Sequence, residues 1–209
     1  MISTNPFATD AMVKASQRPT KKIVDYLQIL VSILAFFVVI YLFFMIPTQV
    51  KGISMFPYLK DKDVLIANRL IQIVGGENGI IKGYDYQRGD VVAFKLEGQP
   101  DLVKRVIGMP GDTIKIENST IYINGVALDE SEYIAPTVNT AGKSFLPEGE
   151  ERIIPPNNYA LIGDNRENSI DSRDSLIGFV DRSNIKGRDF LRVYPLSSII
   201  IIKRPEYNI

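Results

Sequence analysis

The sequence predicts a mostly β protein: a single N-terminal transmembrane helix followed by an antiparallel, β-barrel-like domain with a small inserted lobe. Two observations lead to this prediction. One apolar segment near the N-terminus is long enough to cross a bilayer, and the later chain alternates short apolar runs with Gly, Pro, Asn and Asp. We expect a tail at residues 1–22, an anchor at 23–47 and a β domain at 48–209, with the inserted lobe within 113–160.

The anchor is predicted from the segment ILVSILAFFVVIYLFFMI, residues 29–46, in which Ser32 is the only clearly polar residue. A helix of this length spans about 27 Å, close to the hydrocarbon thickness of a bilayer, and Pro47 is expected to end it. A buried core helix is rarely apolar on all sides over this length, and a cleaved signal peptide has a shorter apolar region followed by a small-x-small site. IPTQVKG is a poor site of that kind, so we interpret the segment as an uncleaved anchor.

Basic residues beside the anchor predict its orientation. Four precede the apolar segment, whereas Lys51 is the nearest basic residue after it. The positive-inside rule then places the N-terminus in the cytoplasm and the chain after Pro47 outside. The four preceding residues are Lys14, Arg18, Lys21 and Lys22.

The expected strands are short, rich in β-branched residues and separated by turn sequences such as Pro110-Gly111-Asp112 and Asn124-Gly125. No long amphipathic helical period appears after residue 60, and residues 74–87 are expected to form a loop. The strands are expected within residues 90–96, 102–109, 112–117, 120–125, 189–196 and 198–203.

The composition excludes several kinds of chemistry. The chain has no histidine and no cysteine, and its 24 basic residues balance 24 acidic ones. It therefore cannot form a Ser-His-Asp triad, a Cys-His dyad, a disulfide or a histidine-ligated zinc site, and nothing suggests a nucleic-acid binder. If the protein performs hydrolysis, the base must be Asp, Glu, Lys or Tyr, or a metal held by oxygen ligands.

A serine nucleophile can use a lysine base when burial lowers the pKa of the amine. In DLVKRVIGM, a strand period puts Lys104 on one face with Leu102 and Val106. Lys95 is the second candidate, whereas Lys115 is expected to face water. A lysine in a strand more often faces solvent, so the residues alone leave the role of Lys104 open.

The candidate nucleophile is Ser54, within VKGISMFPYL. It lies seven residues past Pro47 and therefore close to the bilayer in any fold. A serine in such a stretch is more often a turn former, and this alternative also stays open.

Four segments in order resemble the sequence boxes of bacterial type I signal peptidases, which are membrane-bound Ser-Lys proteases that remove signal peptides from exported proteins. The segments are GISMFPYL, RGDVVAF, LVKRVIGMPGD and GDNRENSIDSR, and with the anchor they cover nearly all of residues 23–203. The resemblance implies a single-pass serine endopeptidase of the bacterial plasma membrane, with its catalytic domain on the outer side and no metal or cofactor. Its implied partners are preproteins with signal peptides, the lipid bilayer and the protein translocation machinery, but no nucleic acid.

The resemblance also assigns roles to individual residues. Ser54 would be the nucleophile and Lys104 the general base, a known variant of triad chemistry. Ser169 would hydrogen-bond to the lysine and orient it, and Met55 would pack beneath the site and help to exclude water.

The same resemblance implies a supporting scaffold and a binding groove. Asp171 and Arg173 would form an ion pair, and Asp164, Asn165 and Arg166 would surround the pocket. An extended substrate would lie between two strands, with small pockets for alanine-like residues at the first and third positions before the cut. One strand would be Gln49, Val50, Lys51 and Gly52, and the other Asp101, Leu102 and Val103.

Two positions depart from the family pattern. Gly52 stands where some members carry a serine whose hydroxyl joins the oxyanion hole, and Tyr58 stands where threonine is usual. The hole would then depend on backbone N–H groups, chiefly that of Ser54. The alternatives are a dedicated maturation Ser-Lys peptidase and a membrane-anchored β domain that only binds peptides.

Overall fold

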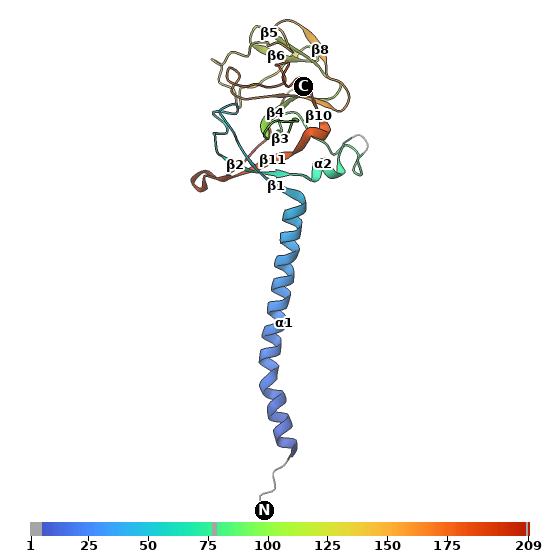
Figure 1. Ribbon diagram of the computed structural model, residues 1–209, viewed down its shortest axis with the longest axis vertical. Helices are drawn as coiled ribbons and strands as arrows, with labels where there is room; N and C mark the ends of the chain where they lie inside the picture. The colour runs from blue at the N-terminus through green and yellow to red at the C-terminus, as the bar shows by residue number, and fades with distance from the viewer. Residues whose placement is uncertain (1–5, 77–78, 208) are drawn as a thin grey trace, which may run out of the picture. The chain divides into compact units, whose positions relative to one another are not determined.

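A computed structural model describes residues 6–76, 79–207 and 209, with side chains described from residue 21 onward. The chain divides into two compact units, one ending at Phe43 and the other comprising Phe44–Ile209. In the described part of the chain, the first unit is helix α1 up to Phe43, and the second contains the strands and the short helix α2 (Leu70–Val74) (Figure 1).

Helix α1 comprises Pro6–Phe44, so it is longer than the predicted anchor. Its part from Lys21 to Phe44 has a mean hydropathy of 2.7, is not buried by the protein, and is long and apolar enough to cross a membrane. The helix includes residues 6–22 of the expected tail. It begins at Pro6, and a proline is tolerated at the first helical position because the N–H that it lacks would have no partner there. Residues 1–5 of that tail, and the side chains of Lys14 and Arg18, lie outside the described part of the chain.

The predicted end of the helix at Pro47 is wrong. The helix ends at Phe44, and Met45–Gln49 form strand β1, which pairs antiparallel with β2 (Val64–Asn68). Strand β1 is at the edge of its sheet, where a proline is tolerated because one row of backbone groups has no strand partner.

The main sheet is antiparallel and has the order β1-β2-β11-β3-β4-β9-β10, with β12 paired to β11. All six sequence ranges that were expected to contain strands do contain them. The prediction missed β1, β2, β9 and β10 of this sheet, as well as β7 (Val126–Ala127) and β8 (Glu151–Ile153) of the inserted lobe. Strand β11 begins four residues before its expected range. The remaining bounds are β3 Val91–Phe94, β4 Leu102–Gly108, β9 Asn158–Ile162, β10 Val180–Asp181, β11 Ile185–Tyr194 and β12 Ile200–Ile201.

The inserted lobe is a four-stranded sheet of order β7-β6-β5-β8, at the opposite end of the domain from β1 and β2 (Figure 1). Asn118 and Ser119 join β5 to β6 with φ angles of 51° and 64°, which suit a two-residue hairpin turn. The lobe strands lie within the expected residues 113–160, and Asn158 begins β9 of the main sheet. The lobe strands are β5 Thr113–Glu117, β6 Thr120–Ile123, β7 Val126–Ala127 and β8 Glu151–Ile153.

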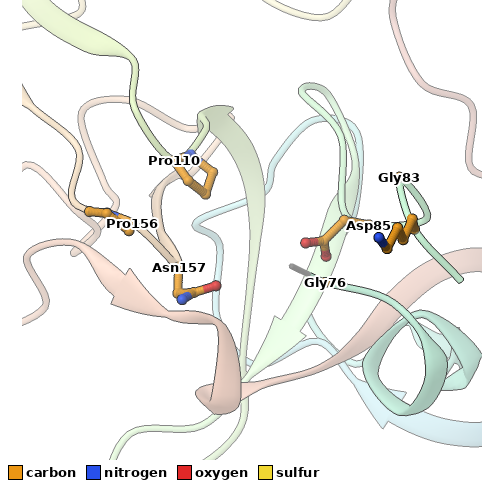
Figure 2. Close-up of a pocket in the computed structure, with 7 residues that line it drawn as sticks. Gly76, Gly83, Asp85, Pro110, Pro156 and Asn157 are labelled. Atoms are coloured by element: carbon orange, nitrogen blue, oxygen red, sulfur yellow. The ribbon is translucent and has the colours of Figure 1, made fainter. Parts of the chain in front are cut away.

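A cavity of about 470 Å³ opens between the loop after α2 and two turns of the domain (Figure 2). Asp85 on its wall pairs with Arg182 at 2.9 Å, so its charge already has a structural partner. The cavity is lined by Gly76, Lys82, Gly83, Asp85, Pro110, Pro156 and Asn157.

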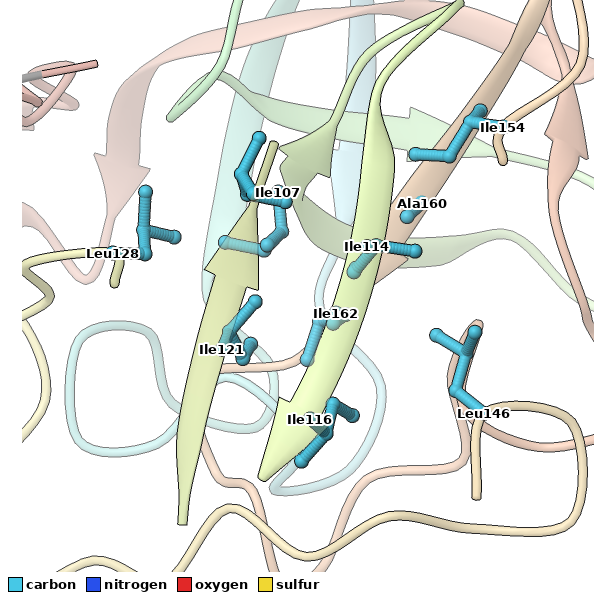
Figure 3. Packing of buried hydrophobic residues seen from close by; sticks show 10 residues of the cluster. Ile107, Ile114, Ile116, Ile121, Leu128, Leu146, Ile154, Ala160 and Ile162 are labelled. Atoms are coloured by element: carbon cyan, nitrogen blue, oxygen red, sulfur yellow. The ribbon is translucent and has the colours of Figure 1, made fainter. Parts of the chain in front are cut away.

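Buried isoleucines join the lobe to the main sheet (Figure 3). In β5 and β6 every second residue is buried, as the period of a strand requires when one face packs on a core. Lys115 lies on the opposite face of β5 and pairs with Glu117 at 2.9 Å, in keeping with its expected orientation. The cluster contains Ile107, Ile114, Ile116, Ile121, Ile123, Leu128, Leu146, Ile154, Ala160 and Ile162.

Candidate active site

Ser54 lies in a turn after β1, and apolar side chains fix this turn to the core. Met55 and Leu59 are fully buried and pack with Val91 and Val103 of two neighbouring strands. The N–H of Leu59 donates to the carbonyl of Met55 at 2.8 Å. With Met55 held in the core, the adjacent Ser54 stays half-buried at the surface of the domain.

Lys104 reaches the serine from the middle of β4. Its Nζ lies 2.6 Å from Ser54 Oγ, and it also donates to the carbonyl of Val103 at 3.2 Å. Lys104 is only 2% exposed, and Leu102 and Val106, two residues before and after it in the strand, pack into an apolar cluster. The two residues are fifty positions apart in the chain, and a close contact between a buried amine and a hydroxyl is what a Ser-Lys pair requires.

Burial lowers the pKa of Lys104 from 10.5 to about 8, because the ammonium loses its hydration. The carboxylates of Asp171 and Asp164 act in the opposite direction, and the cations of Arg173 and Lys143 add to the lowering. A useful fraction of the amine is therefore neutral near physiological pH, which a solvent-exposed lysine could not supply.

Ser169 is buried beside the pair, but the hydrogen bond expected from it to Lys104 is not formed. Its Oγ has no hydrogen-bond partner among the residues that the structure describes. A Cβ built on Gly163 would lie 2.2 Å from Ser169 Oγ and 2.6 Å from the Ser54 carbonyl oxygen. Ser169 thus packs against the backbone next to the nucleophile, while the Lys104 amine is directed to Ser54 and Val103.

Asp171 and Arg173 form a fully buried ion pair with two hydrogen bonds of 2.9 Å. Asp171 also accepts the N–H of Gly163 at 3.1 Å, and Arg173 donates to the carbonyl of Arg166 at 2.7 Å. Burial alone would raise the pKa of Asp171, but the hydrogen bonds and charge of Arg173 outweigh it and hold the pKa below its usual range. The pair therefore stabilises the segment that carries Ser169.

A second buried ion pair involves Arg105, the residue after Lys104. Arg105 donates to both carboxylate oxygens of Asp164, at 2.9 and 2.7 Å. Its guanidinium lies 4.2 Å from the ring centre of Tyr133 and 5.2 Å from that of Tyr58, distances at which cation–π attraction is favourable. Tyr58, the departure from the family pattern, thus contacts the residue next to Lys104.

Arg166 and Asn165 both bond to the backbone close to the Ser54–Lys104 pair: Arg166 Nε donates to the carbonyl of Gly163 at 3.1 Å, and Asn165 bonds to Ser54. Arg166 is buried, pairs with Glu130 and donates to the hydroxyl of Thr140 at 2.9 Å, so it connects the site to the inserted lobe. Asn165 donates its backbone N–H to the Ser54 carbonyl at 2.9 Å.

The expected substrate-binding strands are only partly regular strands. Of the first set, Gln49 ends β1, whereas Val50 exchanges backbone hydrogen bonds with residues 62 and 63. Gly52 donates its N–H to Asp61 Oδ1 at 2.7 Å, and its φ of 81° favours glycine. Lys51 between them is exposed.

The second set lies at the start of β4. Leu102 and Val103 pair with β3 on one side, but pairing with β9 on the other side begins only at Arg105. Residues 102 and 103 therefore present a backbone edge that no other described strand occupies. Asp101 precedes this edge and pairs with Lys186 at 2.6 Å.

Two other features do not belong to the site. Lys95, the second candidate base, is exposed just after the end of β3. The cavity of Figure 2 is lined by neither Ser54 nor Lys104. The contacts of Arg105, Tyr133 and Glu130 were not predicted from the sequence, because each contact joins elements far apart in the chain. The one available signal was the pair of adjacent charges, Lys104 and Arg105, in an otherwise apolar strand.

Comparisons with known proteins give matches to one family. The family model described as "Signal peptidase, peptidase S26" matches residues 23–194. Signal peptidase IB of Staphylococcus aureus (strain MRSA252) is 33% identical over 198 residues, covering 87% of this chain and 96% of that protein. Signal peptidase I P of Bacillus subtilis subsp. natto is 31% identical over 192 residues, covering 90% and 98%.

Among solved structures, a signal peptidase I from Enterococcus faecalis V583 is 29% identical, with a TM-score of 0.39, and the match covers 50% of this chain and 96% of that chain. The family model and the two sequence relatives cover most of the chain, and they confirm the resemblance of the four sequence segments. The chain belongs to the signal peptidase family, peptidase S26.

Proposed function

We propose that this protein cleaves signal peptides from exported preproteins, with Ser54 as nucleophile and Lys104 as general base. The observation that supports this most directly is the 2.6 Å contact between Ser54 Oγ and the Nζ of a lysine that is 2% exposed. A domain that only bound peptides would gain nothing from burying an amine against a hydroxyl, because burial of an ammonium is costly.

In the proposed acylation step, the neutral Nζ of Lys104 accepts the hydroxyl proton of Ser54 while Oγ attacks the scissile carbonyl carbon. The carbonyl electron pair moves onto oxygen, and the N–H of Ser54 donates to the resulting oxyanion. Collapse of this intermediate breaks the C–N bond, and the Lys104 ammonium protonates the leaving amine. A water then attacks the acyl-enzyme with Lys104 again as base, which releases the signal peptide and restores the hydroxyl.

The substrate is proposed to bind in an extended conformation along the open edge of β4. The backbone of Leu102 and Val103 is available there for pairing, and alternate side chains of the substrate would enter pockets. Opposite this edge, Val50 bonds to residues 62 and 63. Because successive backbone groups of an extended chain face opposite sides, Lys51 would present its N–H and carbonyl to the substrate.

We also propose that the protein is anchored in a membrane by its N-terminal helix. The apolar helix from Lys21 to Phe44 would anchor the enzyme with its N-terminus in the cytoplasm and residues 48–209 outside, following the positive-inside rule. A preprotein anchored by its own signal peptide would then present its cleavage site at the membrane face. The bilayer and the translocation machinery are accordingly proposed as partners.

The test is cleavage of a preprotein by the purified full chain in detergent. Ser54→Ala and Lys104→Met should each abolish turnover while the β domain remains folded by circular dichroism. Lys95→Met is the matched control, because Lys95 is an exposed lysine beside the same sheet, and it should cleave like the wild type. Near wild-type turnover by either of the first two variants would refute the assignment of the pair.

A further inference from the structure

Asn165 holds both carbonyl groups that flank the proposed nucleophile. Its side-chain Nδ2 donates to the carbonyl of Ile53 at 3.0 Å, and its backbone N–H donates to the carbonyl of Ser54 at 2.9 Å. Its own amide is oriented by Asn168, whose Nδ2 donates to Asn165 Oδ1 at 3.1 Å. One residue from a distant segment therefore restrains two consecutive peptide groups at the site.

The restraint on Ile53 sets the direction of the Ser54 N–H. The peptide bond between the two residues is trans, so its C=O and N–H point in opposite directions within one plane. The Ile53 carbonyl also accepts the N–H of Phe56 at 3.0 Å, on the same side as Asn165. With the carbonyl fixed from that side, the Ser54 N–H is directed away from Asn165 and cannot rotate without breaking both bonds.

This direction matters because the site has few other donors for an oxyanion. Gly52 has no side-chain hydroxyl, and its N–H is already donated to Asp61 Oδ1 at 2.7 Å. The Ser54 N–H therefore contributes a larger share of the oxyanion stabilisation than it would in a site where a serine hydroxyl is a second donor. An oxyanion donor works by being fixed before the charge appears, so its orientation affects the rate directly.

We propose that Asn165 is a positioning residue for the oxyanion hole: it fixes the Ile53–Ser54 peptide plane so that the Ser54 N–H faces the developing oxyanion. This inference rests on the proposed role of Ser54 as nucleophile. Asn165 bonds to the carbonyl end of this peptide group, opposite the N–H, and does not itself touch the substrate. Its loss should therefore weaken binding of the transition state and spare binding of the ground state.

Asn165→Ala removes the side-chain donor without adding a charge near Lys104. We expect kcat, measured on the high-pH plateau of preprotein cleavage, to fall by about 10- to 100-fold, because a full oxyanion donor contributes about 100- to 1000-fold. KM should change less than about threefold, and the kinetic pKa of Lys104 should stay in place. Affinity for a peptide aldehyde, which forms a tetrahedral adduct with the serine, should fall in parallel with kcat, while affinity for the cleaved signal peptide should not.

Asn165→Asp is the second variant, because it is nearly isosteric and keeps the fold testable if the alanine variant does not fold. Its carboxylate oxygen would replace the donor opposite the Ile53 carbonyl and should lower kcat at least as much. Asn139→Asp is the matched control: Asn139 is exposed in the inserted lobe, and its oxygen accepts the Ser119 hydroxyl in either form. This variant should retain wild-type kcat and aldehyde affinity.

The outcomes separate this inference from the proposed function. Turnover by Ser54→Ala would overturn the proposed function and this inference with it. An inactive Ser54→Ala together with unchanged kcat in both Asn165 variants would overturn the inference alone. The inference is also overturned if aldehyde and product peptide lose affinity equally, because that pattern means that the whole groove, rather than the oxyanion donor, is displaced.

Discussion

Lys104→Met should inactivate the enzyme and at the same time stabilise it at neutral pH. The pKa of Lys104 in the folded protein is about 8, against 10.5 for an unburied lysine. Below pH 8 both states are protonated, and the folded state carries the full cost of a buried ammonium. From the shift of about 2.5 pH units, that cost is about 3 kcal/mol at pH 7.

The sign of the pH dependence follows from proton counts. Between pH 8 and 10.5 the unfolded chain still binds the lysine proton while the folded protein has released it, so the wild-type stability rises with pH in this window. By pH 10 the remaining cost is about 1 kcal/mol. Methionine has no such cost at any pH, but it loses the hydrogen bonds to Ser54 and Val103, worth about 1 kcal/mol each.

The free energy of unfolding of Lys104→Met should thus exceed that of the wild type by about 1 kcal/mol at pH 7 and fall below it by about 1 kcal/mol at pH 10. Urea unfolding of the full chain in detergent, followed by circular dichroism at both pH values, measures this. The exposed Lys95→Met is the control, and its difference from wild type should not depend on pH. An equal stability difference for Lys104→Met at pH 7 and 10 would mean that Lys104 titrates normally, and the reasoning would fail.

Three further predictions follow from the same contacts. First, kcat/KM of the wild type should rise about tenfold per pH unit below the Lys104 pKa of about 8 and level off above it; a pH profile that is flat from 6 to 9 would contradict a lysine base. Second, Asp171→Asn should lower the free energy of unfolding by about 3 to 5 kcal/mol in urea titrations, because Arg173 is left buried without its carboxylate; a loss below about 1 kcal/mol would contradict this. Third, Gly163→Ala should cost about 1 to 3 kcal/mol and reduce turnover, because the added methyl group meets Ser169 Oγ at 2.2 Å; unchanged unfolding and cleavage would show that the segment can move aside.

The features predicted correctly from the sequence are those with a local signal. The strands between residues 90 and 125 follow from β-branched alternation and from turns that suit only a few residue types, such as Asn124-Gly125. The end of α1 could not be read in this way. Met45 and Ile46 continue the apolar composition of the anchor, and only pairing with β2, a contact made by tertiary structure, turns them into a strand.

The site was predicted at the level of residues but not of hydrogen bonds. Sequence boxes identified Ser54, Lys104 and Ser169, and the structure gathers them in one place. The hydrogen bond expected from Ser169 to the lysine is absent, since side-chain orientation depends on packing around Gly163 that no local pattern encodes. Asn165 was expected only to surround the pocket, because its contact with Ile53 joins residues 112 positions apart.

The two buried ion pairs resolve a conflict in the electrostatics of the site. Asp164 and Asp171 both raise the pKa of Lys104, and uncompensated carboxylates at that depth would keep the amine charged and useless as a base. Each carboxylate is instead bonded through both oxygens to an arginine, Arg105 for Asp164 and Arg173 for Asp171. The acids can therefore hold the segment around Gly163 against the nucleophile turn while adding little net negative charge. Burial then remains the largest influence on the lysine, so the packing that positions Ser54 also sets the protonation state of its base.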